Sequence, residues 1–233
     1  MLLIALPPPE WLSNFYNTVK NGVVPVKPED WKLGSYIDFH GQYISRDEQT
    51  KLYVRHFYNE LFELIKGNGT KYHLLLGNPG IGKSAFGIYL ICRFFDEKRE
   101  ILYQTDADTS ISYWFKREEV VLTNVSAMKI MTENPNTVYI SDGNMQPALV
   151  QKGKSYCISI ASTQCIAKNL HEHRKRANFK YYMPMFKEQE IDELLAIHKH
   201  DIFTVDAIKL RYKFFGGMNH VRNRICFINL CMI

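Results

Sequence analysis

The sequence has no long hydrophobic run and almost no charge imbalance. Nothing in it approaches the roughly 18 consecutive apolar residues of a membrane-spanning helix, so we expect no membrane partner. Lys and Arg number 29 against 24 Asp and Glu, a formal net charge of +5 that permits acidic partners but does not require them. Hydrophobic residues make up 46% of the 233 positions and charged residues 23%, which excludes a wholly disordered or fibrous chain.

The sequence also lacks a Cys-x-x-Cys pair. Its five cysteines are an odd number and lie scattered, at Cys92, Cys157, Cys165, Cys226 and Cys231. Cys92 and Cys157 fall in apolar segments, where a free buried thiol is the favoured interpretation. The apolar start, Met1–Leu6, is too short for the core of a secretory signal. We therefore expect an intracellular, reducing location.

Two familiar catalytic motifs are absent. Without a Gly-x-Ser-x-Gly elbow the chain is not expected to be a serine hydrolase. Without an Asn-Lys-x-Asp guanine motif a GTPase is disfavoured, and His198-Lys199-His200-Asp201 only resembles one.

Apolar patterns of strand and helix type alternate along the chain, which predicts an α/β fold with a parallel sheet covered on both faces. We expect strands at 72–76, 100–104, 137–142, 155–161 and 180–183, a hairpin at 111–115 and 119–122, and helices at 47–66, 83–95, 126–131, 164–175, 187–198 and 204–215. We expect three parts: a leader at 1–40, rich in Pro and Trp and packed through Trp11 and Trp31, a core at 41–183, and a helical lid at 184–233.

One glycine-rich segment between a predicted strand and a predicted helix matches the phosphate-binding motif G-x-x-x-x-G-K-[ST] in full. It reads Gly77-Asn78-Pro79-Gly80-Ile81-Gly82-Lys83-Ser84, followed by Ala85. Glycines let backbone N–H groups turn inward as an anion nest, and the following helix directs its positive end to the same place. Lys83 adds a full charge for the β- and γ-phosphates, and the Ser84 hydroxyl is a candidate Mg²⁺ ligand. The segment 77–85 therefore predicts binding of a nucleoside triphosphate with Mg²⁺.

A metal-binding acid is expected downstream of such a loop. Asp142 ends the apolar strand 138–142 and is the candidate Mg²⁺ ligand, the alternative being a strand-end Asp that starts a turn with Gly143. No Glu follows it to activate water. Asp106, Asp108 and Gln146 are the candidates to replace that Glu, or they are ordinary loop residues.

Polar residues also follow the next strand. Thr163 or Gln164 is a candidate sensor of the γ-phosphate, and a helix cap is the equal alternative. Further on, the segment Lys168–Lys180 carries five basic residues and one acidic residue. It is a candidate arginine finger in a homo-oligomer or a contact for nucleic acid phosphates, although a solvated helix end is slightly favoured.

Five stretches together resemble the P-loop domain of Crinkler effectors, an arrangement that the retrotransposon hot spot proteins of trypanosomes share. They are YISRDEQTKLYVRHFYNELFELI (43–65), LLLGNPGIGKSAFGIYLI (74–91), VYISDGN (138–144), YYMPMFKEQEIDELL (181–195) and FFGGMNHVRNRI (214–225). The resemblance implies an additional-strand ATPase fold of the AAA/STAND type with a small helical lid, in which Lys83 and Ser84 bind phosphate and Mg²⁺ and Asp142 is the metal acid.

The chain departs from this family near its end. The family has an arginine that senses the γ-phosphate where this chain has His220, so Arg222 or Arg224 is the candidate replacement. Nothing before residue 40 resembles the family's ubiquitin-like leader, and no nuclease or kinase-like module follows the lid. We therefore expect an isolated or truncated NTPase module.

Three functions follow from these observations. The first is an Mg²⁺-dependent ATPase that works as a conformational switch. The second is a nucleotide-dependent binding module that does not hydrolyse ATP, because Asp142 lacks a following Glu and His220 replaces the arginine. The third, disfavoured by the hairpin and the closing helices, is a small-molecule P-loop kinase.

Overall fold

The computed structural model describes residues 8–21, 34–39, 50–67, 71–105, 111–124, 133–143, 154–162 and 179–197. Its helices are α1 (Glu10–Lys20), α2 (Tyr58–Gly67), α3 (Lys83–Asp96) and α7 (Glu188–Ile197). Its strands are β1 (Ser35–Asp38), β2 (Lys51–Val54), β3 (Tyr72–Gly77), β4 (Glu100–Thr105), β5 (Ile111–Phe115), β6 (Val120–Asn124), β7 (Thr137–Asp142), β8 (Tyr156–Ser162) and β9 (Phe179–Tyr182).

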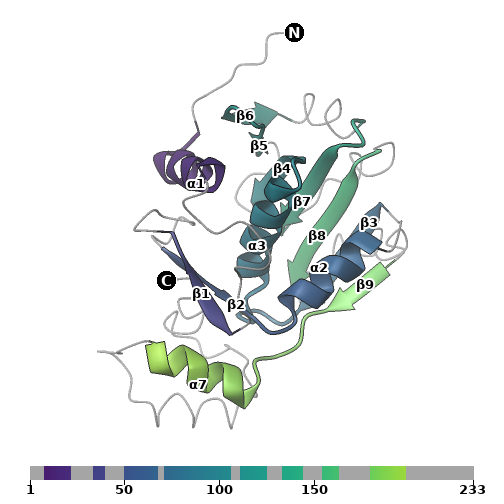
Figure 1. Cartoon of the computed structure of the whole chain (residues 1–233). Coiled ribbons are helices and arrows are strands. Elements are labelled where there is room, and N and C mark those ends of the chain that lie inside the picture. Colours follow the sequence, from purple (N-terminus) through teal and green to yellow (C-terminus); the bar gives the residue numbers. More distant parts are fainter. Residues whose placement is uncertain are drawn as a thin grey trace.

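Seven strands form one sheet in the order β6-β5-β4-β7-β8-β3-β9 (Figure 1). The five strands β4, β7, β8, β3 and β9 are parallel, and the β5–β6 hairpin extends the sheet antiparallel to β4. Strand β8 lies between β3, which leads into the glycine-rich loop, and β7, which ends in Asp142. This is the additional-strand order, so the predicted α/β fold class is confirmed, including the added hairpin.

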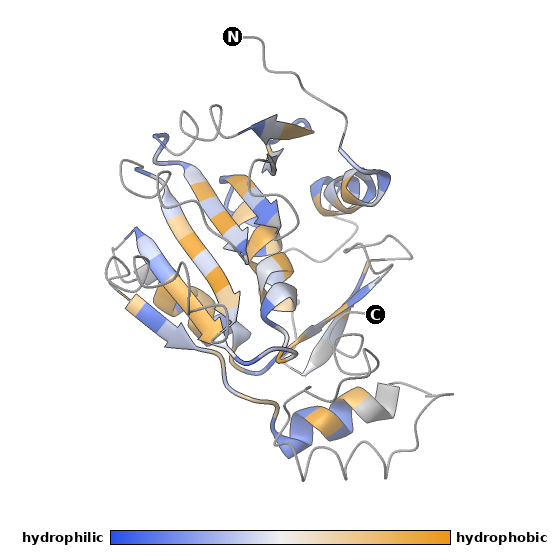
Figure 2. Cartoon of the chain, turned by 180° about the vertical axis from the view of Figure 1, so that it is seen from behind, coloured by the Kyte–Doolittle hydropathy of each residue, from blue (hydrophilic) through white to orange (hydrophobic). Residues whose placement is uncertain are grey.

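Helix α3 covers one face of the parallel strands. All residues from Ala85 to Phe94 are buried, as expected for a helix enclosed in a core. A Cβ added at Gly87 would lie 3.2 Å from Ile160 Cδ1, so α3 lies close against β8. The opposite face is buried too, since Leu74, Leu76 and Tyr139 are 0% exposed. Because both faces are buried, these strands place apolar residues on each of them. Figure 2 shows orange residues alternating with paler ones along several of these strands.

One predicted element is wrong in part. The segment 47–66 reads as a single helix, but Lys51–Val54 is strand β2 and the helix begins only at Tyr58. Strand β2 pairs antiparallel with β1, with Ser35 opposite Val54 and Asp38 opposite Lys51. The backbone groups of β2 are therefore satisfied by a separate segment, a partner that periodicity within one stretch does not reveal.

The amino-terminal part contains a helix that the sequence did not predict. Helix α1 buries Leu12, Phe15, Tyr16 and Val19. The Phe15 ring centroid lies 5.7 Å from that of Phe39 and 6.2 Å from that of Phe115. Helix α1 therefore attaches the start of the chain to the β5–β6 side of the molecule (Figure 1). Trp11 packs edge-on against Tyr113, whereas Trp31 lies outside the described residues.

Of the other predicted elements, some match the structure and some lie outside the described residues. The strands β3, β4, β7, β8 and β9 and the helices α3 and α7 match their predicted segments to within a few residues. The predicted helices at 126–131, 164–175 and 204–215 lie outside the described residues, so α7 is the described part of the predicted lid. Among the described residues, no helix combines the length and apolar character that crossing a membrane requires.

Two cysteines lie in the described core. Cys92 in α3 and Cys157 in β8 are free and buried, as predicted. Burial raises the pKa of the Cys157 thiol to about 11, so this thiol stays protonated at neutral pH. The pKa of Cys92 is raised by burial as well. Both cysteines are therefore packing residues rather than reactive groups.

Candidate functional site

The glycine-rich loop connects the end of β3 to the start of α3. Gly80 has φ 78° and Gly82 has φ 84°, both in the left-handed region that residues with a Cβ adopt at a cost. Gly82 is the N-cap of α3, and as a glycine it has no side chain that could cap the helix. The backbone of residues 80–84 therefore turns at the positive end of a 14-residue helix, the arrangement that binds anions.

The base of the loop is closed by packing. Ile81 is 1% exposed and lies over Gly77, where an added Cβ would collide with Ile81 Cδ1. Met183 also approaches Gly77, and its backbone N–H donates to the carbonyl of Leu76 over 2.7 Å. Gly77 is thus required by a close approach of the loop to its own strand.

Lys83 lies within the curve of the loop. Its Nζ donates a hydrogen bond to the carbonyl of Asn78 over 2.6 Å, and the side chain is half-buried. Ser84, the next residue, is exposed on the first turn of α3, and Ala85 is buried beneath it. A positive charge and a hydroxyl thus lie at the mouth of the same backbone nest.

The carboxyl ends of the neighbouring strands meet beside this loop. Asp142, the last residue of β7, is opposite Ile160 of β8, while Ser162 at the end of β8 is opposite Gly77. Paired residues point to the same face, and Ile160 faces α3, so Asp142 and Ser162 lie on the α3 side of the sheet. With one strand between them, β7 and β3 are about 10 Å apart.

The donor atoms at the carboxyl ends of these strands suit a hard cation. Asp142 supplies carboxylate oxygens and Ser84 a hydroxyl, the oxygen ligands that Mg²⁺ takes beside phosphate oxygens and water. Within the described residues, no three His, Cys, Asp or Glu side chains gather to hold a metal by themselves. The residues therefore fit a cation that enters with a phosphate ligand rather than one held by a closed protein cage.

The underside of the loop is held by residues that the sequence analysis did not single out. Arg55, between β2 and α2, donates from Nη1 to the carbonyl of Ile81 over 3.0 Å. Tyr58 donates from its hydroxyl to the carbonyl of Gly82 over 3.1 Å. The signal in the sequence was a charged residue inside the apolar stretch 52–58.

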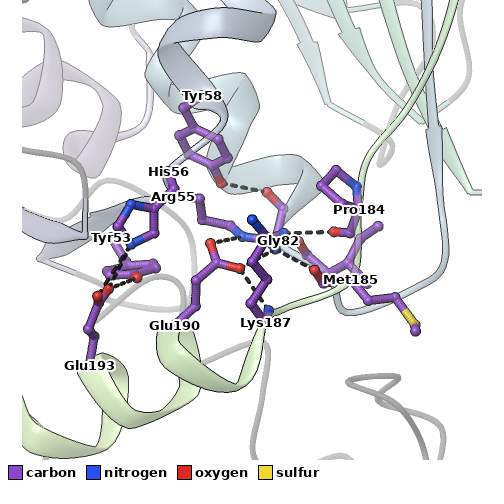
Figure 3. A network of polar contacts seen from close by, with 11 residues as sticks. Tyr53, Arg55, His56, Tyr58, Gly82, Pro184, Met185, Lys187, Glu190 and Glu193 are labelled. Atoms are coloured by element: carbon purple, nitrogen blue, oxygen red, sulfur yellow. Dashed lines mark hydrogen bonds and ion pairs between the residues drawn. The ribbon is translucent and has the colours of Figure 1, made fainter.

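Arg55 also joins the loop to α7. It forms a two-pronged ion pair with Glu190, both side chains being almost fully buried. One turn further along α7, Glu193 accepts a hydrogen bond from Tyr53 and lies 3.2 Å from His56 Nε2 (Figure 3). Glu193 also accepts a hydrogen bond from the side chain of Gln189. Burial raises the pKa of Glu193, but these hydrogen bonds outweigh it and hold that pKa below 4.5.

Several predicted site residues lie outside the described residues. They are Thr163 and Gln164 after β8, Asp106, Asp108 and Gln146, the sensor candidates His220, Arg222 and Arg224, and most of the Lys168–Lys180 cluster. Of that cluster Lys180 is described, and it is exposed on β9. The structure therefore brings together the loop 77–85 and Asp142.

Comparison with known proteins gives distant similarity. No family model matches the chain. Over 183 residues it is 24% identical to Crinkler effector protein 15 and Crinkler effector protein 16 of Phytophthora infestans, covering 72% of this chain and 28% of each relative. The chain thus spans little more than a quarter of those relatives. Among solved structures it is similar to the RuvB Holliday junction branch migration motor of Thermotoga maritima, with 12% identity, a TM-score of 0.37 and coverage of 66% of this chain and 53% of the motor.

Proposed function

We propose that this chain binds ATP with Mg²⁺ and hydrolyses it as a conformational switch. One observation carries the proposal: the backbone nest at Gly80–Ser84, at the start of α3, lies one strand away from the carboxylate of Asp142. An anion nest beside a hard-cation ligand matches the two parts of a metal-bound triphosphate.

Each residue has a distinct task in this proposal. The N–H groups of residues 80–84 bind the phosphates, and Lys83 neutralises charge that develops on the β- and γ-phosphates. Ser84 and Asp142 would hold Mg²⁺, which when bound would offset the negative charge of the phosphates. We extend the proposal to Thr163 and Arg222 as sensors of the γ-phosphate, from their position in the sequence.

A second candidate is a module that binds ATP without hydrolysing it. The residue after Asp142 is Gly143, with φ 113°, and its N–H donates to the carbonyl of Ile160. This position therefore supplies no carboxylate to activate water. Hydrolysis then requires a base from elsewhere in the chain, with Asp106, Asp108 and Gln146 as the candidates.

Substitution of Lys83 tests nucleotide binding. We expect Lys83→Ala to weaken ATP binding at least about 100-fold, since charge-assisted hydrogen bonds are worth about 1.5–3 kcal/mol each and the ammonium forms several. Calorimetric titration with ATP and Mg²⁺ measures this. Lys154→Ala, an exposed lysine before β8, is the matched control and should bind like the wild type. Equal affinity in the Lys83 and Lys154 variants would refute the assigned site.

Phosphate release separates the two candidate functions. Turnover by the wild type that disappears in Asp142→Asn supports the ATPase, with Asp96→Asn at the exposed end of α3 as the control. Binding without turnover in the wild type supports the module. Phosphorylation of an added nucleoside instead of release to water would identify a small-molecule kinase.

We further propose that the chain is one module of a larger protein. The relatives carry the name of effector proteins, and this chain matches about a quarter of their length, which favours a nucleotide-dependent module of a larger effector-type protein.

The Lys168–Lys180 cluster is the candidate contact for a second copy or for nucleic acid. A gel shift at about 50 mM salt tests nucleic acid binding, because phosphate contacts are strongest at low salt.

A further inference from the structure

Arg55 is a buried cation whose guanidinium donates a full set of hydrogen bonds. Its side chain is 1% exposed, and Nε and Nη2 donate to the two carboxylate oxygens of Glu190 over 2.9 and 2.8 Å. Nη1 donates to the carbonyls of Ile81 and Pro184, both over 3.0 Å, and Nη2 donates to Met185 over 2.9 Å. These bonds use all five N–H groups of the guanidinium.

These contacts join parts of the chain that are distant in sequence. Glu190 belongs to α7, and Pro184 and Met185 belong to the segment that follows β9 (Figure 3). Ile81 belongs to the glycine-rich loop. The guanidinium also lies over the Phe186 ring, 3.9 Å from its centroid. Because the fork geometry of Arg fixes all these directions at once, a shift of α7 cannot leave the loop contact unchanged.

Tyr58 holds the next carbonyl of the same loop. Its hydroxyl bonds to Gly82 O, and its ring packs on Phe86 of α3 with a centroid separation of 4.9 Å. A trans peptide unit is planar, so its N–H points opposite to its C=O. Holding the carbonyls of Ile81 and Gly82 from beneath therefore orients the N–H groups of Gly82 and Lys83 toward the other side, where the proposed phosphate lies.

We propose that Arg55 and Tyr58 are positioning residues of the nucleotide loop, and that Arg55 makes the loop's geometry depend on the docking of α7 through Glu190. This inference rests on the proposed function. A buried ion pair alone is weak evidence for stability, but this one has a contact on the loop backbone. By thermodynamic reciprocity, a docked α7 strengthens nucleotide binding, and bound nucleotide stabilises the docked α7 to the same extent.

Matched variants on α7 test the first part. Glu190→Gln removes the charge partner of Arg55, whereas Glu193→Gln alters the contacts of α7 with Tyr53 and His56 and touches no loop residue. We expect ATP affinity to fall at least tenfold in Glu190→Gln, measured by calorimetry on folded protein. In Glu193→Gln it should fall less than twofold, because the intact Arg55–Glu190 pair still docks α7. A merely structural role lowers the melting temperature of both and shifts the affinity of neither.

Tyr58→Phe is a second and more conservative test variant, because it keeps the ring and removes one hydrogen bond to Gly82 O. We expect about fivefold weaker ATP binding, the cost of one hydrogen bond of about 1 kcal/mol. It also keeps the test decisive if Glu190→Gln fails to fold. Unchanged affinity in Tyr58→Phe would overturn the positioning role.

Hydrogen exchange on the unmodified protein tests the coupling itself. Saturating ATP with Mg²⁺ should slow amide exchange in residues 188–197 of α7 and leave residues 111–124 of the β5–β6 hairpin unchanged. Exchange in α7 that is indifferent to bound ATP overturns the coupling while the proposed function stands. A wild type that binds no ATP in calorimetry overturns both, so the two failures are distinct.

Discussion

Gly77 shows how tightly single residues are fitted beneath the loop. Ile81 fills the space that a side chain at position 77 would need, and Ile81 is itself buried. The glycine therefore matters for packing at the strand–loop junction, separately from the positive φ angles of Gly80 and Gly82. Space at this point determines how closely the loop can approach β3.

Gly77→Ala is expected to lower the free energy of unfolding by about 1–3 kcal/mol, because the new Cβ forces a buried isoleucine out of place. Gly67→Ala is the control, since an added Cβ at the end of α2 meets nothing within 4 Å and alanine is the better helix former. Urea denaturation of both variants measures the difference. A variant at position 77 as stable as the one at 67 would contradict this account.

At the scale of elements, α1 is attached through one apolar face. Phe15 lies at the centre of that face and is 0% exposed, between Phe39 and Phe115. Its contacts come from the segment after β1 and from the β5–β6 hairpin, two parts of the chain that are distant in sequence. Helix α1 therefore links the start of the chain to the antiparallel end of the sheet.

Phe15→Ala should destabilise the protein by about 3–5 kcal/mol, the usual cost of removing a buried aromatic ring. Asn17→Ala, on the exposed side of the same helix, should change stability by less than about 0.5 kcal/mol. The urea midpoints of the two variants provide the comparison. If both substitutions have the same small effect, α1 does not contribute to the core.

The attachment of α7 should depend on pH through Glu193. Tyr53, His56 and Gln189 face this carboxylate, and its pKa lies below 4.5 in the folded protein. A lowered folded pKa means that ionised Glu193 contributes its full stability above about pH 4.5. That contribution is lost as the pH falls through the folded pKa.

Urea unfolding from pH 7 to pH 3 measures this dependence. The wild type should lose more stability below pH 4.5 than Glu193→Gln, which carries no titrating group at this position. Curves that run parallel for the two proteins across the whole range would show that Glu193 makes no pH-dependent contribution.

At the scale of the whole molecule, the sheet order places the proposed binding residues side by side at the carboxyl ends of the parallel strands. The loop follows β3 and Asp142 ends β7, and both strands are buried on both faces. A ligand held at the carboxyl ends of these strands binds the folded chain and not the unfolded one. Its binding energy therefore adds to the stability of the entire domain.

ATP with Mg²⁺ at about 100 times its dissociation constant should add about 2.7 kcal/mol of stability. For a chain of this size the melting temperature should rise by roughly 5–10 °C. Lys83→Ala should show no such rise, whereas Lys154→Ala should match the wild type. Thermal melts followed by circular dichroism measure the shift, and equal shifts in both variants would argue against binding at the loop.

Much of the fold and of the proposed site was predictable from short stretches of sequence. The glycine-rich loop, the strand before it and the helix after it are adjacent along the chain, so local apolar patterns and glycine chemistry predicted all three. The β5–β6 hairpin was predictable for the same reason. Asp142 was recognisable because it ends a predicted strand of mostly apolar residues.

The tertiary structure alone decided which distant segments meet. Residues 51–54 are a strand because β1 supplies their hydrogen-bond partners, and Arg55 is buried because Glu190, 135 residues further on, neutralises it. A sequence pattern reports what one segment prefers, whereas pairing and charge burial depend on partners that only the folded chain brings together. The loop and its chemistry were therefore predictable from the sequence, and its support by Arg55, Tyr58 and α7 was visible only in the structure.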